Sequence, residues 1–216
     1  MKILVNGGTG RMGKAVCKQA KQMGIETVVC DKNSWDTVDV NGVCGIIDFS
    51  NPSATDKLLK VATKNKLPLV IATTGQTASE IEKIELAAKK IPICLTANTS
   101  KGIAVLNKLC EYIYNEYKTC HAEIIEFHHK NKVDSPSGTA KIIASRLNDI
   151  REDSVGIASV RGGDEIGTHE VIFYCDNEII TVKHQALNRK LFALGAIELL
   201  EKLKNKKKGL YRESVD

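Results

Sequence analysis

Proton carriers and cations are concentrated in one short segment of this sequence, EFHHKNKVDSPSGTA, from Glu126 to Ala140. Histidine exchanges a proton near neutral pH, so His128 and His129 are candidates for acid–base chemistry. Lys132 adds a cation, which can also donate a proton if burial lowers its pKa. Residues 137–139 stand where a helix is expected to begin, and hydroxyls and backbone N–H groups there bind carboxylates. The segment therefore predicts a site for a polyanionic substrate beside a proton source.

Each of these residues also has a plainer explanation. A lone histidine is more often structural than catalytic, and Lys132 also fits a surface charge. The hydroxyls of Ser137 and Thr139 also fit the N-cap of the expected helix. His121 lies close to the histidine pair, but no cysteine or carboxylate completes a ligand set, so we predict no metal site.

A second chemical signal is the glycine-rich stretch LVNGGTGRMGKAV. Gly7, Gly10 and Gly13 have the spacing G-x-x-G-x-x-G, a variant of the dinucleotide fingerprint, between an expected strand and an expected helix. Glycines allow the tight turn and the close approach to a pyrophosphate, which the N–H groups of the following helix then hold. Arg11 adds a cation. A glycine turn without a ligand is the alternative, and the strand–loop–helix context favours the nucleotide.

The acid expected on the ribose of this nucleotide is Asp31, which ends the second expected strand. Asp31 favours NADH because a carboxylate repels a 2′-phosphate, whereas the neighbouring Lys32 would relieve that repulsion. We therefore expect both NADH and NADPH to serve as cofactors.

These residues need elements that position them. The first 98 residues alternate expected strands and helices, which predicts a parallel sheet with right-handed crossovers. A long helix, a strand, a helix and three closely spaced strands follow, which predicts a mixed sheet with helices on one face. The fold class is therefore α/β: a Rossmann-type parallel-sheet dinucleotide-binding domain plus a smaller α+β domain with a mixed sheet. The expected strands are 2–6, 26–31, 45–50, 68–75, 91–98, 121–129, 155–161, 169–175 and 178–184, and the expected helices are 10–24, 56–65, 81–90, 101–117, 139–150 and 191–205.

The composition is that of an ordinary globular protein. Of the 216 residues 43% are hydrophobic and 26% are charged. No apolar run approaches the roughly 20 residues of a membrane helix. The opening MKILVNGG leaves no room for a signal peptide before the first strand, so we expect a cytoplasmic protein. The seven cysteines are odd in number and form no CxxC, so a disulfide framework is not expected and most are assigned to the core.

The formal net charge is +5, and basic residues cluster near the C-terminus. Such a cluster binds nucleic acid in some proteins, but no aromatic residues alternate with these lysines as single-strand binding requires. We adopt the alternative of a solvated helix end favoured by the helix dipole, with no nucleic acid and no membrane as partner. The cluster consists of Lys202, Lys204, Lys206, Lys207, Lys208 and Arg212.

Together, NGGTGRMG and EFHHKNKVDSPSGTA closely resemble motifs of the 4-hydroxy-tetrahydrodipicolinate reductase family, also called dihydrodipicolinate reductases, of the diaminopimelate route to lysine. The family signature E-x-H-H-x-x-K-x-D-x-P-S-G-T-A is present in full. The chain departs from the family at Ala72, where glycine is common, at Thr99, where an aromatic residue is common, and at Asn188, where serine is usual. Smaller matches are DFSNP from Asp48, ATTG from Ala72, TANTS from Thr96, RGGDEIGTHEV from Arg161 and HQALNRKLFALGA from His184.

The resemblance implies an NAD(P)H-dependent enzyme that removes the ring hydroxyl of 4-hydroxy-tetrahydrodipicolinate as water and reduces the resulting conjugated bond. It implies a nucleotide domain over 1–98, completed by a C-terminal helix over 189–216, and a substrate-binding domain over 99–188 that also builds a homotetramer. It makes His128 the proton donor and Lys132 a second catalytic cation. The implied contacts to the substrate carboxylates are His129, Ser137, Gly138 and Thr139. The implied cofactor contacts are Gly7, Gly8, Thr9, Gly10, Arg11 and Met12 at the pyrophosphate, Asp31 at the adenosine ribose, Ala72, Thr73 and Thr74 beside the nicotinamide, and Thr96, Ala97, Asn98 and Thr99 in the pocket between the domains.

Three rival functions follow from the residues, and the intact histidine–lysine segment argues against one of them, a reductase-like protein with a drifted function. Another NAD(P)-dependent oxidoreductase, acting on an anionic amino or imino acid, shares the glycine loop but does not need the histidine–lysine segment. A redox sensor binds NADH without turnover and uses the basic cluster to meet nucleic acid, which would make its DNA binding salt-sensitive.

Overall fold

A computed structural model describes residues 1–35, 37–152 and 154–212. The chain divides into two compact units. Unit 1 holds residues 1–100 and the segment that begins at Arg189, and unit 2 holds residues 101–188.

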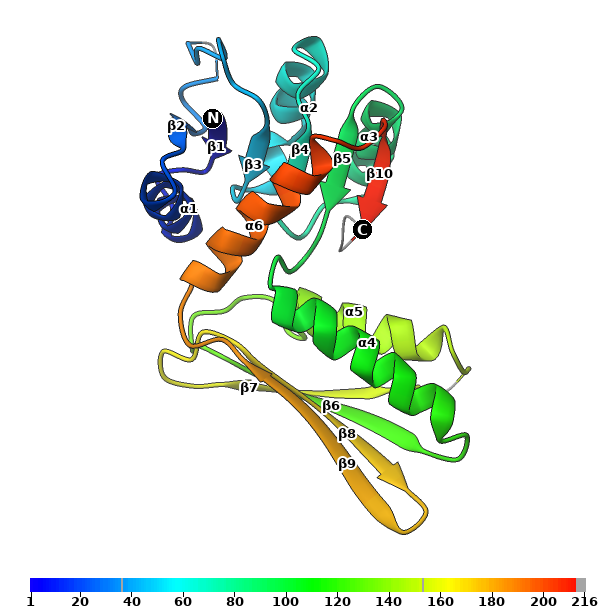
Figure 1. Cartoon of the computed structure of the whole chain (residues 1–216). Helices are drawn as coiled ribbons and strands as arrows, with labels where there is room; N and C mark the ends of the chain where they lie inside the picture. The colour runs from blue at the N-terminus through cyan, green and yellow to red at the C-terminus, as the bar shows by residue number, and fades with distance from the viewer. Residues whose placement is uncertain (36, 153, 213–216) are drawn as a thin grey trace. The chain divides into compact units, whose positions relative to one another are not determined.

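Unit 1 is built on a six-stranded sheet in which all neighbouring strands are parallel (Figure 1). The strand order β10-β5-β4-β3-β1-β2 changes direction at β1, and ligands of such sheets bind at the carboxyl edge beside this point. The predicted Rossmann-type sheet is confirmed. Its strands are β1 (Lys2–Asn6), β2 (Glu26–Cys30), β3 (Ile46–Asp48), β4 (Leu69–Ile71), β5 (Pro92–Leu95) and β10 (Gly209–Arg212).

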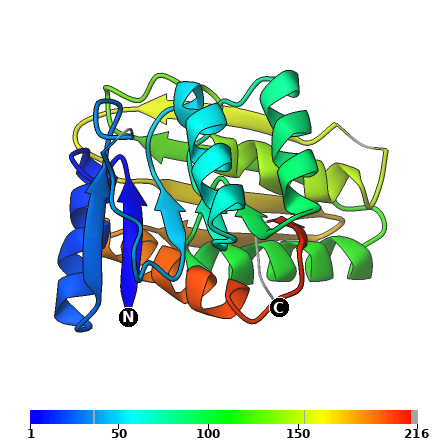
Figure 2. The same ribbon diagram turned by 90° about the horizontal axis from the view of Figure 1, so that it is seen from above.

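Helices cover both faces of this sheet (Figures 1 and 2). Successive strand residues point to opposite faces. Leu4 therefore packs on the side of α2 and α3, while Ile3 and Val5 pack on the side of α1 and α6. Burial on both faces explains why the strands are nearly continuous apolar runs. The helices are α1 (Arg11–Gln22), the 3₁₀ turn η1 (Pro52–Ala54), α2 (Thr55–Lys64), α3 (Ala78–Ala88) and α6 (Lys190–Leu203).

The start of α3 shows how a local signal sets the boundary of an element. The Thr77 hydroxyl accepts a hydrogen bond from the backbone N–H of Glu80 at 3.3 Å. The Glu80 carboxylate in turn accepts the N–H of Thr77 at 2.7 Å. Together they form a capping box, which satisfies two N–H groups that a helix start leaves without partners.

The end of unit 1 differs from the prediction. The helix expected over 189–216 ends at Leu203, and β10 follows and pairs with β5. In β10, Leu210 packs on the α2–α3 side of the sheet and Tyr211 packs on the α1–α6 side. This alternation spans too few residues to stand out beside the lysine cluster. The last part of the expected helix, 213–216, lies outside the described residues.

Unit 2 is a four-stranded sheet of order β7-β6-β8-β9 with two helices, α4 and α5, on one face (Figure 1). The β6–β7 pair is parallel and the other pairs are antiparallel, which confirms the predicted mixed sheet. Tyr114 and Phe173 are the largest side chains of its core. Among the described residues, no helix combines the length and apolar composition that crossing a membrane requires. The elements are α4 (Lys101–Glu116), β6 (His121–His128), α5 (Gly138–Asn148), β7 (Gly156–Arg161), β8 (Thr168–Cys175) and β9 (Glu178–Gln185).

The cysteines correct one expectation. Cys120 and Cys175 form a disulfide, with Cα atoms 4.4 Å apart. The pairing of β6 with β8 places His121 opposite Tyr174, so the next pair outward is these two cysteines. Their sequence separation of 55 residues gave no signal of this proximity. The other five cysteines are free thiols.

Candidate active site

The glycine loop of unit 1 joins β1 to α1 and depends on the absence of side chains. Gly7 has a φ of +74°, and a Cβ there would lie 2.4 Å from the carbonyl oxygen of Phe49. A Cβ on Gly13 would lie 2.1 Å from the carbonyl oxygen of Gly7. Gly10 is the N-cap of α1 and offers no side chain to its first N–H groups. The loop therefore fits a pyrophosphate, which those N–H groups and the helix dipole would hold.

The other predicted cofactor residues follow the carboxyl ends of the parallel strands. Asp31 comes directly after β2, residues 72–74 after β4, and residues 96–99 after β5. Carboxyl ends of parallel strands meet at one edge of a sheet. The fold thus brings these residues to the edge that carries the glycine loop, while their contacts with a cofactor stay a prediction.

The turn after β2 orients Asp31. Its Oδ1 accepts the backbone N–H of Asn33 at 2.9 Å and lies 3.3 Å from the hydroxyl of Ser34. That hydroxyl also accepts the N–H of Asp31 at 2.8 Å. Lys32 is exposed. The oriented Asp31 suits the ribose of NADH, and the exposed Lys32 suits the 2′-phosphate of NADPH. The prediction that both cofactors serve is therefore unchanged.

A buried carboxylate, which the sequence reasoning missed, holds residues together at the carboxyl edge of the unit 1 sheet. Asp48, at the end of β3, is 2% exposed. Its oxygens accept the amide of Asn6 at 2.7 Å, the hydroxyl of Ser50 at 2.5 Å and the hydroxyl of Thr73 at 2.6 Å. Burial raises the pKa of Asp48, and these hydrogen bonds oppose the increase. Asp48 thereby ties the ends of β1 and β3 to the residues that follow β4.

The proton-carrier segment belongs to unit 2, where it leaves β6 and enters α5. His128, the last residue of β6, is 9% exposed. Ser137 is the N-cap of α5, and its hydroxyl accepts the N–H of Ala140 at 3.2 Å. Gly138 begins the helix and Thr139 is buried in its first turn. His129 lies half-buried just after the strand.

Lys132 has an acidic partner. Its Nζ donates to Oδ1 of Asp134 at 2.7 Å, and its side chain is 21% exposed. Burial works to raise the pKa of Asp134, but the hydrogen bond and charge of Lys132 lower it overall. The loop therefore holds its cation in one place before any substrate arrives.

Two charged residues that the sequence reasoning did not single out surround His128. Glu126 lies two residues earlier on the same face of β6 and is 0% exposed. Its Oε2 lies 2.5 Å from Nδ1 of His128. Arg161, at the end of β7, donates to the same carboxylate at 2.9 and 2.6 Å. Side chains alternate between the two faces of a strand, which places Glu126 and Arg161 on the face that α4 and α5 cover. Charged residues at such covered positions were the signal in the sequence.

A second buried histidine adjoins the start of α5. His169 pairs with Glu126 across β6 and β8 and is 2% exposed. Its Nε2 lies 3.2 Å from the hydroxyl of Ser137. Burial, aided by the charge of His128, lowers the pKa of His169 to about 3. This ring is therefore neutral at physiological pH.

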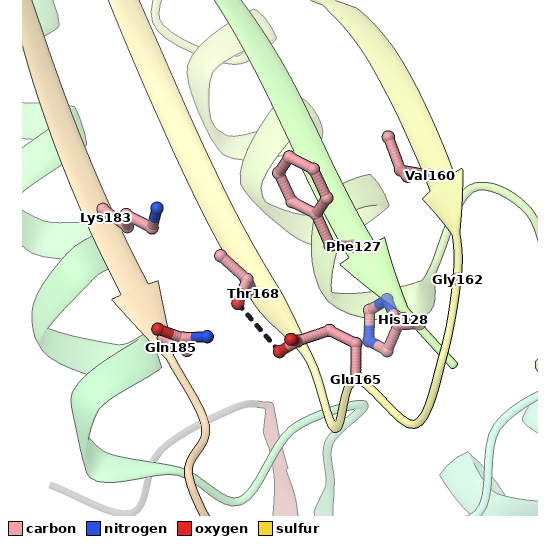
Figure 3. A pocket seen from close by; sticks show the side chains of 8 residues that line it. All are labelled: Phe127, His128, Val160, Gly162, Glu165, Thr168, Lys183 and Gln185. Carbon is pink, nitrogen blue, oxygen red and sulfur yellow. Dashed lines mark hydrogen bonds between the residues drawn. The ribbon is translucent and has the colours of Figure 1, made fainter. Parts of the chain in front are cut away.

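A pocket of about 290 Å³ opens at the end of the sheet where β6 stops (Figure 3). His128 lines it beside Glu165, whose carboxylate accepts the hydroxyl of Thr168 at 3.0 Å. The imidazole of His128 therefore borders a cavity. Its lining residues are Phe127, His128, Val160, Gly162, Glu165, Thr168, Lys183 and Gln185.

Within residues 1–35, 37–152 and 154–212 no group of three or more His, Cys, Asp or Glu side chains is arranged to hold a metal ion. The prediction of a metal-free site stays a prediction. The predicted cofactor residues all lie in unit 1, and the predicted acid–base and carboxylate-binding residues all lie in unit 2.

Comparison with known proteins assigns both units. Residues 1–99 match the family described as dihydrodipicolinate reductase, N-terminus, and residues 102–214 match dihydrodipicolinate reductase, C-terminus. The 4-hydroxy-tetrahydrodipicolinate reductase of Caldanaerobacter subterraneus subsp. tengcongensis is 37% identical over 98% of this chain and 96% of that protein. The reductase of the same name from Brachyspira hyodysenteriae is 41% identical over 77% of this chain and 80% of that protein.

A solved structure shares the fold. The dipicolinate-bound dihydrodipicolinate reductase of Paenisporosarcina sp. TG-14 superposes with a TM-score of 0.79 at 19% identity, over 98% of this chain and 97% of that one. These matches, which cover both units, put the chain in the class of NAD(P)H-dependent oxidoreductases. The chain belongs to the dihydrodipicolinate reductase family.

Proposed function

We propose that this protein is an enzyme that reduces 4-hydroxy-tetrahydrodipicolinate to tetrahydrodipicolinate with NADH or NADPH, in the diaminopimelate route to lysine. The observation that carries the proposal is the complete loop from Glu126 to Ala140. The chain that contains this loop matches the family over both units. The loop runs from His128, at the end of β6, through Lys132 to the start of α5. The rival sensor function would not need this loop.

His128 is assigned as the proton donor. Elimination of the ring hydroxyl as water leaves a conjugated ring, to which a nicotinamide cofactor supplies a hydride at one carbon. The neighbouring carbon then takes a proton from the protonated ring of His128, which becomes neutral. Proton transfer from a positioned side chain is typically worth about 10²–10⁴-fold in rate.

Lys132 and the start of α5 are assigned to the negative charges of the substrate. The ammonium group of Lys132 is already fixed by Asp134, so little ordering is needed when a dianion binds. Ser137, Gly138 and Thr139 add hydroxyls and helix-start N–H groups, which suit a carboxylate. His129 is assigned to a carboxylate as well.

The cofactor is assigned to the carboxyl edge of the unit 1 sheet. The glycine loop over residues 7–12 holds the pyrophosphate, and Asp31 holds the adenosine ribose, with Lys32 available for a 2′-phosphate. Residues 72–74 and 96–99 are assigned to the nicotinamide half. Support comes from their shared position after β4 and β5.

We also propose that the protein is a cytoplasmic homotetramer whose subunits meet through the unit 2 sheet. The strand register puts Val160, Tyr174 and Ile179 on the face of this sheet opposite its core side chains, and they are 42%, 45% and 63% exposed. Exposed apolar patches on a sheet favour burial against a second copy. Five of the seven cysteines are free thiols, which favours a reducing compartment, whereas the Cys120–Cys175 disulfide is typical of an oxidising one.

The test follows nicotinamide absorbance while a coupling synthase makes the substrate from pyruvate and aspartate semialdehyde, with NADH and NADPH in parallel. Oxidation that depends on the synthase supports the reductase and ranks the cofactors. Protein that binds a cofactor but oxidises neither would refute the proposal and favour a different substrate or a sensor.

A further inference from the structure

We infer that Glu126, held by Arg161, positions His128 for proton donation by fixing Nδ1 as the nitrogen that keeps its hydrogen and Nε2 as the nitrogen that exchanges one. The inference rests on the proposed role of His128. It adds two residues that touch neither substrate nor cofactor in the proposed reaction and act through His128.

Several donors surround the Glu126 carboxylate. Oε2 lies 2.5 Å from Nδ1 of His128 and 2.9 Å from one guanidinium nitrogen of Arg161. Oε1 accepts the other guanidinium nitrogen at 2.6 Å and the N–H of Ser137 at 3.2 Å. A fork of two guanidinium bonds on one carboxylate holds it in a fixed plane. The carboxylate therefore cannot turn away from the imidazole.

The Glu126 carboxylate carries a negative charge in the folded protein. Burial works to raise the pKa of Glu126, but hydrogen bonds led by those from Arg161 lower it to about 2. Glu126 is therefore ionised throughout the working pH range. An ionised carboxylate only accepts hydrogen bonds, so the hydrogen between it and His128 must sit on Nδ1. The nitrogen left for exchange is Nε2.

The surroundings of Nε2 differ from those of Nδ1. Gly167 faces this atom, and a Cβ on that residue would lie 3.0 Å from Nε2. His128 also lines the pocket at the strand end. The exchanging nitrogen thus borders a position without a side chain, while the other nitrogen is closed off by the carboxylate.

The pairing of β6 with β7 builds this arrangement. Arg161 lies opposite His128 in the parallel β6–β7 register, and the N–H of Gly162 donates to the carbonyl of His128 at 3.0 Å. The other charged or titratable groups near the imidazole, among the residues that the structure describes, are Lys132, the pocket residue Glu165 and His169, whose ring centroid lies 5.3 Å away. The carboxylate of Glu126 is the group at hydrogen-bond distance from Nδ1, so Glu126 sets the tautomer.

The main test is Glu126→Gln. The amide keeps the shape of the side chain but can donate to Nδ1, which moves the ring hydrogen to Nε2. Turnover should fall by roughly 10²–10⁴-fold, with NADH affinity changed less than about threefold. The matched control is Glu123→Gln, which alters the exposed pair of Glu123 and His121 on the same strand, 2.8 Å apart, and should leave turnover unchanged.

A readout independent of activity is the ¹⁵N spectrum of the histidine rings at pH about 8, where the neutral tautomers are distinct. His128 is identified by the signals lost in His128→Gln. An Nδ1–H tautomer in the natural protein, shifted toward Nε2–H in Glu126→Gln, is expected. An Nε2–H tautomer in the natural protein overturns the inference, even if the Glu126 variant does not fold.

The two proposals fail separately. If His128→Gln keeps its turnover, the proposed catalytic role of His128 is wrong. If His128→Gln loses turnover while a folded Glu126→Gln stays within threefold of the natural protein, only the positioning role is wrong.

Discussion

The hydroxyl of Thr73 donates a 2.6 Å hydrogen bond to Oδ2 of Asp48 and also accepts the backbone N–H of Ser50 at 2.8 Å. One side chain from the segment after β4 thus satisfies both a buried carboxylate and a backbone group at the end of β3. These contacts lie at the edge of unit 1 to which the cofactor is assigned.

Replacement of Thr73 by valine should destabilise the protein by about 1–3 kcal/mol, because a buried acceptor and a backbone donor each lose a partner while the volume hardly changes. Denaturant unfolding of the cofactor-free protein measures this. Thr74→Val, at the exposed neighbouring position, should stay within about 0.5 kcal/mol of the natural protein. Equal effects of both changes would contradict the importance of the Asp48 contacts.

Replacement of His128 by glutamine or Lys132 by alanine should reduce kcat by about 10²-fold or more. The dissociation constant for NADH should hardly change, because both residues lie in unit 2. Steady-state assays with separate NADH titrations check this. Lys130→Ala removes an exposed lysine of the same loop and should retain turnover. A Lys132 variant that behaves like the Lys130 variant would remove Lys132 from the mechanism.

Binding of pyridine-2,6-dicarboxylate should take up protons. Burial lowers the pKa of His128, aided by Lys132 and Arg161 and opposed by Glu126, so the ring is neutral in the free protein at pH 7. A bound dianion raises that pKa, and uptake of up to about one proton per site follows. Calorimetry in two buffers of different ionisation enthalpy measures the uptake, which His128→Gln should abolish. Binding without proton uptake at pH 7 in the natural protein would contradict the argument.

Acid should destabilise unit 2 through His169. Its folded pKa of about 3 lies below the unfolded value of 6.5, so below pH 6.5 the unfolded chain binds a proton that the folded chain does not. As the pH decreases below 6.5, the free energy of unfolding therefore decreases by up to about 1.4 kcal/mol per pH unit. Unfolding at pH 6.5 and 5 should show a smaller loss in His169→Gln. His121→Gln changes an exposed histidine and should keep the full loss of unfolding free energy. If that loss is equal in His169→Gln and in the natural protein, His169 is not its cause.

Replacement of Ile179 by lysine should split the proposed tetramer, because it places a charge opposite Tyr174 on the exposed face proposed as the interface. Light scattering during size-exclusion chromatography measures the molar mass. Leu86→Lys changes an exposed apolar residue of unit 1, 59% exposed, and should leave the mass unchanged. An unaltered mass for Ile179→Lys would exclude this face as the interface.

The sequence predicted features whose signal is local. The glycine loop lies within one turn of chain, and the capping box of α3 needs only Thr77 and Glu80. The parallel sheet followed from alternating apolar strands and amphipathic helices, each readable in a short window. The acid–base segment was recognised because its residues are neighbours in sequence.

Features that depend on strand register were missed. Glu126 and Arg161 are 35 residues apart and meet only because β7 pairs with β6 in a particular alignment. Asp48 and Thr73 meet for the same reason across β3 and β4. The cysteine pair depends on the β6–β8 alignment, and β10 was too short to show periodicity. A shift of one residue in any of these pairings would separate the partners, and no single window of sequence reports it.

The position of α6 and β10 in the chain governs the order in which this protein can mature on the ribosome. Ala193, Ala196, Ile197 and Leu200 of α6 cover one face of the unit 1 sheet, yet they are synthesised after all of unit 2. Until then α1 is the only helix of this cluster that covers that face, and the apolar residues that pack against α6 lack their partner. The inserted unit holds its own core and can fold first. The nucleotide-binding unit, although it starts the chain, is completed last.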